Sequence, residues 1–207
     1  GYSVARAHAG SGYRAGDEEL AVWALGAWER ATGGALRFVP VAEAQALIRI
    51  HFVPAGAGQY GEMRALRLGE RRGAAVYVRP DTDALGPDIA GRARNDVLFR
   101  DTVVFLTCLH EVGHALGLIH TADFRDIMFF FGYGGDIPAF FGRFRERLTA
   151  RADIAMESGL SDGDVAQLRA LYPRRCPGLI RRRTKYCDAR HHVCSQLRSC
   201  AALAERA

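Results

Sequence analysis

The sequence predicts an α+β domain, and three observations point to that class. The chain has 207 residues, 49% of them apolar, which suffices for one buried core and a small appendage. Residues 17–32 and 97–117 carry apolar side chains at helical spacing, whereas segments between them alternate in polarity or are rich in β-branched and aromatic residues. Because a helix with one apolar face needs a surface to cover it, we expect a sheet of those strands beneath the helices.

Each element has a local signal. Residues 2–8 suit a short strand, and the helix at 17–32 ends where Gly33 and Gly34 follow. Further strands are predicted at residues 35–39, 46–52 and 74–78. Surface loops are predicted at residues 54–72, which are rich in Gly and charge, and at residues 80–95.

The charge balance is mildly basic. The formal net charge is +5, and much of the excess lies between residues 174 and 185. A local excess of this kind does not indicate a nucleic-acid binder. No stretch approaches the roughly 18 uninterrupted apolar residues of a membrane span. We therefore expect a monomer with neither a nucleic-acid partner nor a membrane span.

The cysteines are unevenly distributed. Four of them fall in the last 32 residues: Cys176, Cys187, Cys194 and Cys200. Two disulfides, formed in an oxidising compartment, would order a segment too short to build much of a core. We therefore expect a secreted, extracellular or periplasmic protein with a main domain at residues 1–173 and a basic, Cys-rich appendage at residues 174–207. A metal site that uses His191 and His192 is the alternative, although the C-x₂-C spacing of zinc knuckles is missing.

The most informative segment is residues 110–120, with the sequence HEVGHALGLIH. On a helix, His110 and His114 lie one turn and about 40° apart, so both imidazoles can reach one metal ion. Glu111 falls beside that face, displaced from a ligand position but close enough to contact a water on the metal. Gly117 can turn left-handed and end the helix, which swings His120 back toward the metal. The pattern therefore predicts a zinc site of His110, His114 and His120.

The opposite face of this helix is apolar and is expected to be buried. Its members are Phe105, Cys108, Leu109, Val112 and Leu116. Cys108 points about 160° away from His110. We therefore interpret it as a buried, inert thiol and not as a nucleophile.

Together with two further segments, the motif resembles the metzincin metallopeptidases, and specifically the matrixin family. Met128, in Asp126-Ile127-Met128, follows His120 at a spacing similar to that of the matrixin Met-turn. Residues 160–172 are similar to the family's C-terminal helix with its leading Asp. The resemblance implies a metzincin-like catalytic domain: a twisted, mostly parallel sheet with an antiparallel edge strand, an active-site helix and a C-terminal helix.

The resemblance also implies roles for residues outside the motif. Met128 would form an apolar floor beneath the zinc histidines. Phe130 stands where astacin-like relatives carry a Tyr that can approach the metal, which favours the matrixin side. The edge strand along which a peptide substrate extends would include Ala74, Ala75, Val76 and Tyr77.

The sequence differs from the matrixin pattern at the sites for metals other than the catalytic zinc. Matrixins commonly hold a second, structural zinc through three His and an Asp, but no His lies between His51 and His110, so we expect that site to be missing. Calcium could be bound by Asp81, Asp83 or Asp88, whose carboxylate oxygens are suitable ligands. The alternative is that these residues form a solvated Asp-rich loop. The expected cofactor is one catalytic zinc, with calcium left open.

These residues predict a zinc-dependent endopeptidase that acts on protein or peptide substrates. Three neutral imidazoles leave the metal one position for water, whose pKa falls to about 7. Glu111 would accept the water's proton as general base and deliver it to the departing amine. Two alternatives stay open: a zinc hydrolase of non-peptide amides, which needs the same ligands, and a non-catalytic metal-binding module, which has no need of Glu111.

The segment between Met128 and Leu160 has 31 residues and is rich in Phe and Gly. This is longer than the family's usual connection, which forms the outer wall of the pocket for the side chain after the scissile bond. A short amphipathic helix is predicted within residues 139–155. We expect Phe140 and Phe141 to line the substrate pocket, while the alternative is that these aromatics only cover the core.

Overall fold

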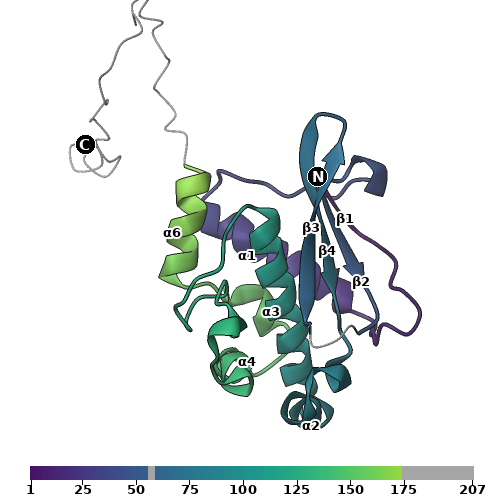
Figure 1. Ribbon diagram of the computed structural model, residues 1–207, viewed down its shortest axis with the longest axis vertical. Helices are drawn as coiled ribbons and strands as arrows, with labels where there is room; N and C mark the ends of the chain where they lie inside the picture. Colours follow the sequence, from purple (N-terminus) through teal and green to yellow (C-terminus); the bar gives the residue numbers. More distant parts are fainter. Residues whose placement is uncertain (56–58, 174–207) are drawn as a thin grey trace, which may run out of the picture. The chain divides into compact units, whose positions relative to one another are not determined.

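The computed structural model describes residues 1–55 and 59–173 (Figure 1). The Cys-rich segment 174–207 and its predicted disulfides lie outside the described residues, so they stay predictions. The strands are β1 (Tyr2–Val4), β2 (Ile48–Phe52), β3 (Gly61–Leu68) and β4 (Arg71–Val78). The α-helices are α1 (Asp17–Thr32), α2 (Pro87–Asn95), α3 (Val97–Ala115), α4 (Ile137–Arg145), α5 (Asp153–Met156) and α6 (Asp162–Leu171). Short 3-10 helices are η1 (Glu43–Gln45), η2 (Thr82–Leu85) and η3 (Phe131–Tyr133).

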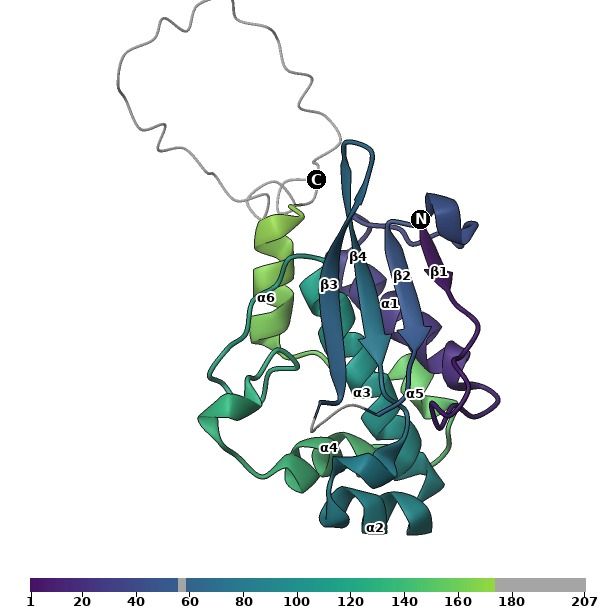
Figure 2. The same ribbon diagram turned by 45° about the vertical axis from the view of Figure 1, so that its right-hand side comes forward.

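The strands of the described residues form one sheet in the order β1-β2-β4-β3 (Figure 2). β1, β2 and β4 run parallel, and β3 pairs antiparallel with β4 at one edge. In register, Ile50 lies beside Val76, and Gly61 lies beside Val78. The predicted class, a mostly parallel sheet with an antiparallel edge strand and covering helices, is confirmed.

The identity of the edge strand was predicted wrongly. Ala74, Ala75, Val76 and Tyr77 belong to β4, which lies between β2 and β3 and is paired on both sides. The edge is β3, within residues that the sequence pattern assigned to a surface loop. An edge strand has solvent along its free side, so it needs no strong apolar alternation. The sequence of β3, GEMRALRL, is accordingly half-buried or exposed throughout.

Other segments also differ from prediction. Residues 35–39 form no strand, although Tyr2 meets Pro40 in an isolated bridge. The bridge consists of the Tyr2 amide donating to the Val39 carbonyl and the Val41 amide donating to the Tyr2 carbonyl, each at 2.9 Å. Because Tyr2 is the first residue of β1, residues 35–39 lie before the start of β1 in this register and have no β1 residue beside them. Residues 80–95 contain η2 and α2, and α2 starts with proline in its first turn, where proline is favoured. The helix predicted within residues 139–155 is divided into α4 and α5.

The core lies between the sheet and the helices α1 and α3, which pack on the same face of it (Figure 1, Figure 2). The Trp28 indole of α1 is fully buried and donates from Nε1 to the Leu109 carbonyl of α3 at 2.8 Å. The predicted apolar face of α3 is buried as expected, and Cys108 is a free, fully buried thiol whose pKa is raised by that burial. One helix therefore contributes both to the core and to the histidine motif.

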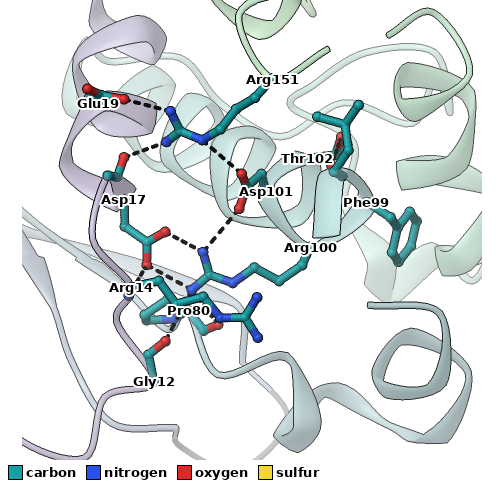
Figure 3. A network of polar contacts seen from close by, with 12 residues as sticks. Gly12, Arg14, Asp17, Glu19, Pro80, Phe99, Arg100, Asp101, Thr102 and Arg151 are labelled. Carbon is teal, nitrogen blue, oxygen red and sulfur yellow. Dashed lines mark hydrogen bonds and ion pairs between the residues drawn. The ribbon is translucent and has the colours of Figure 1, made fainter. Parts of the chain in front are cut away.

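A buried ion-pair network anchors the start of α3 (Figure 3). Arg100 is 1% exposed and donates to both carboxylate oxygens of Asp17, with 2.8 Å between Nη2 and Oδ2. The same guanidinium contacts Asp101, which accepts a hydrogen bond from Arg151. Each buried charge thus has a partner, which offsets its desolvation. Because Asp17 begins α1, the network ties this helix to the first turn of α3.

Candidate metal centre

Helix α3 and the turn that follows it bring three histidines together. His110 and His114 lie one turn apart on α3, as the spacing predicts. The helix ends before Gly117, which takes a φ of 95°, the left-handed conformation expected of it. The chain then reverses, and His120 returns to the face of the helix that carries the other two histidines.

The three imidazoles are arranged as ligands of one ion. Nε2 of His120 lies 3.3 Å from Nε2 of His110 and 3.1 Å from Nε2 of His114. A tetrahedral zinc with Zn–N bonds of about 2.0–2.1 Å would separate its ligand nitrogens by about 3.3 Å. The observed separations match this value, so the cluster fits zinc in size.

Backbone carbonyls set the tautomers of two of the rings. Nδ1 of His110 donates to the Ile127 carbonyl at 2.7 Å, and Nδ1 of His114 donates to the Leu118 carbonyl at 3.0 Å. A carbonyl only accepts, so in the neutral ring Nδ1 holds the proton and the Nε2 lone pair faces the cluster. Burial lowers the pKa of His110 to about 4 and also lowers the pKa of His120. Neutral rings with converging lone pairs repel one another unless a cation lies between them, so the site also fits zinc in its chemistry.

A methionine lies behind the histidines and is held by the C-terminal helix. Met128 is fully buried, and a Cβ on Gly113 of α3 would lie 2.5 Å from its Sδ. The buried Asp164 carboxylate of α6 accepts from the amides of Ile127 at 2.8 Å and Met128 at 3.3 Å. Since the Ile127 carbonyl accepts from His110, a continuous chain of hydrogen bonds runs from α6 to the metal cluster. The sequence pattern predicts the helix that carries Asp164, but it gives no signal for this contact with the Met128 segment.

Glu111 lies beside the histidines and is 6% exposed. The first residue of β3 packs directly against it, since a Cβ on Gly61 would lie 2.7 Å from Cγ of Glu111. Burial raises the pKa of Glu111 to about 7, while the charge of Arg79 acts in the opposite direction. The carboxylate therefore lies next to the metal cluster without belonging to it. No sequence signal pointed to Gly61.

A cavity of about 450 Å³ opens beside the histidines and Glu111. The start of β3 forms one wall, and the aromatic segment after Met128 forms another. Phe140 and Phe141 line this cavity and are also buried, at 3% and 2% exposure, so they serve both as its wall and as part of the core. Residues 74–77 are not among the lining residues, which follows from their central place in the sheet.

Two of the three acidic residues considered for calcium have other partners. Asp81 accepts from the amide of Asp83, and Asp83 pairs with Arg94 at 2.8 Å. Within the part of the chain that the structure describes, these carboxylates form no group of three with metal-binding spacing. Calcium binding therefore stays a prediction without structural support.

An α+β domain whose motif helix brings three histidines together beside a buried glutamate has the architecture of a metallopeptidase catalytic domain. The family model described as Matrixin matches residues 10–135, which is more than half of the chain. The chain belongs to the matrixin family. Membership supports a metallopeptidase whose metal is zinc and whose substrates are peptides, and the His110, His114 and His120 cluster fits that ion. No curated protein matches the chain. Among the described residues, no helix has both the length and the apolar character to cross a membrane.

Proposed function

We propose that the protein is an endopeptidase that cleaves peptide bonds, with zinc held by His110, His114 and His120 and with Glu111 as general base. The observation that carries this proposal is the convergence of three Nε2 atoms beside a buried carboxylate at the wall of a cavity. When bound, zinc supplies a Lewis acid that polarises a carbonyl and lowers the pKa of water.

Glu111 transfers the proton in this proposal. Its carboxylate follows the first histidine in the chain and lines the same cavity as all three. It accepts a proton from the attacking water and then delivers this proton to the departing amine. Gly61 packs directly against its side chain, which limits the positions open to the carboxylate and favours efficient transfer.

The edge strand β3 orients the substrate. Its first residues, Gly61 to Met63, line the cavity, and its outer edge has no neighbouring strand within the described sheet. An extended peptide can add to such an edge through backbone hydrogen bonds, which places one of its peptide bonds beside the histidines. Phe140 and Phe141 would then receive the side chain that follows the cleaved bond.

The alternatives differ in what they require of Glu111. A carboxylate buried without a paired cation within hydrogen-bonding reach costs free energy, and a module that only binds metal gains nothing from it. Its burial beside the histidines therefore favours a hydrolase. A hydrolase of non-peptide amides would share the same ligands, and substrate tests separate it from a peptidase.

The experiment is the replacement Glu111→Gln, compared with the parent protein. The parent is expected to cleave casein, to lose activity with a chelator and to regain it with zinc. Glu111→Gln should bind one zinc per chain, because Glu111 is not a ligand, and should not cleave. Glu43→Gln on the exposed η1 is the matched control and should behave as the parent. Loss of zinc from Glu111→Gln would contradict the general-base assignment, and a zinc-loaded parent that cleaves no peptide bond would contradict the peptidase.

We also propose that the protein acts in an oxidising compartment outside the cytoplasm, on the basis of the four cysteines near the C-terminus. Mass spectrometry without reductant should show Cys176, Cys187, Cys194 and Cys200 paired among themselves, and Cys108 free. Four alkylatable thiols in that segment, or a zinc ion released on their alkylation, would contradict the disulfides.

A further inference from the structure

His120 is held differently from the other two histidines. His110 and His114 each donate from Nδ1 to a backbone carbonyl, which fixes the rotation of their rings. The His120 side chain is exposed, and within residues 1–55 and 59–173 its ring nitrogens have hydrogen-bonding contacts only at Nε2, with the other two histidines. A ligand needs a fixed ring plane to direct its lone pair at a metal. For His120, a contact other than a hydrogen bond to the described protein atoms can supply this constraint.

The ring of Phe130 lies flat against the ring of His120. Their centroids are 4.8 Å apart and their planes are inclined by 28°, which is a stacked pair. The Phe130 ring is in turn met edge-on by Tyr133, with centroids 5.3 Å apart and planes at 88°. Phe130 is 42% exposed, so its position owes more to these contacts than to the core.

Gly132 provides the space for this ring. A Cβ on Gly132 would lie 2.2 Å from Cε1 of Phe130, so any larger residue would displace the ring from its place over His120. The φ of Gly132 is not in the left-handed region, so the glycine is needed for space and not for backbone freedom.

The backbone also sets the register between the two rings. The amide of Thr121 donates to the Met128 carbonyl at 2.9 Å, and the amide of Phe130 donates to the Thr121 carbonyl at 3.1 Å. Thr121 directly follows His120, so these bonds hold the histidine loop beside the segment that carries Phe130. The stacked geometry is therefore supported by the backbone on both sides.

We propose that Phe130 is a positioning residue, whose ring orients the imidazole of His120 for metal binding. This inference rests on the zinc site of the proposed function. Stacking restricts rotation of the imidazole about its bond to Cβ, and it excludes water from one face of the ring. Less conformational freedom is then lost when the metal binds, and affinity is higher for that reason.

The test compares Phe130→Leu with Phe131→Leu. Phe131 lines the same cavity, but its ring contacts are with other aromatic rings and not with a histidine. Zinc affinity is measured by competition with a chromogenic chelator, and ligand geometry is measured from the visible spectrum of the cobalt(II)-loaded protein. From the strength of one aromatic pair, Phe130→Leu should bind zinc about three- to tenfold more weakly and alter the cobalt spectrum. Phe131→Leu should change neither.

Gly132→Ala tests the same contact without changing Phe130. It should weaken zinc binding to a similar degree, and its effect should vanish in the double variant Phe130→Leu/Gly132→Ala, since both act through one ring. Melting of the metal-free proteins checks that each variant is folded. If Phe130→Leu does not fold, Gly132→Ala decides the matter alone.

The outcomes separate this inference from the proposed function. Parent-like zinc affinity and cobalt spectra in both Phe130→Leu and Gly132→Ala would overturn the role of Phe130 while leaving the zinc site intact. A parent protein that binds no zinc would instead overturn the proposed function itself.

Discussion

The close approach of β3 to the motif helix makes a direct prediction about catalysis. A Cβ on Gly61 would lie 2.7 Å from Cγ of Glu111 and 2.8 Å from Cγ2 of Thr107. Carbon atoms in contact need about 3.5–4.0 Å, so Gly61→Ala must displace the Glu111 side chain or β3 by about 1 Å. The φ of Gly61 is not positive, so backbone strain adds nothing to this effect.

The expected loss of catalytic rate follows from that displacement. A misplacement of about 1 Å between a catalytic group and its substrate reduces the rate about 100-fold, which is about 2.7 kcal/mol of activation free energy. We therefore expect kcat/KM of Gly61→Ala for a peptide substrate to fall about 100-fold. Zinc content should not change, because the histidines are held from α3 and from the Met128 segment.

The assay is hydrolysis of a fluorogenic peptide together with metal analysis of the same samples. Gly91→Ala in α2 is the matched control, since a Cβ there meets nothing within 4 Å, and it should keep the parent kcat/KM. An unchanged kcat/KM in Gly61→Ala would refute the argument that Glu111 needs this spacing. Loss of zinc from Gly61→Ala would show that the substitution disturbs the histidines, and it would refute the argument that Gly61 acts through Glu111.

The remaining predictions concern stability and selectivity. Arg100→Met leaves Asp17 buried without its cation and should lower the free energy of unfolding by about 3–5 kcal/mol in denaturant titrations, and a loss under about 1 kcal/mol would contradict this. Trp28→Phe removes the donor to the Leu109 carbonyl and should cost about 1–3 kcal/mol by the same measurement, so parent-like stability would count against that bond. Phe140→Ala and Phe141→Ala should change the residue preferred after the cleavage point in a peptide library, with zinc content constant. If only the melting temperature falls, these aromatics serve the core alone.

Features of the chain that depend on interactions between neighbouring residues could be predicted from the sequence. The helix at residues 17–32 was predicted with the bounds that α1 shows, because its apolar spacing and the glycines after it are local signals. The convergence of His110, His114 and His120 was also predicted, since helical geometry and one left-handed glycine determine it within eleven residues.

The sheet was harder to predict because strand pairing joins distant residues. The apolar sequence of β4 showed that it is a strand, but not whether it lies at the edge or in the middle of the sheet. The half-exposed β3 has almost no periodic signal, although it supplies the edge and one wall of the cavity. Residues 35–39 resembled a strand, yet in register with β1 they lie before its first residue, so only the single bridge of Tyr2 with Pro40 forms.

The sequence by itself determined the class of fold, the helix of the motif and the convergence of its three histidines, because each depends on the regular geometry of a short stretch of chain. Only the tertiary structure decided that Gly61 packs against Glu111, that Asp164 supports the segment behind His110, and that Phe130 stacks on His120. These contacts depend on how β3, α6 and the aromatic segment pack around α3, and no local periodicity encodes such packing.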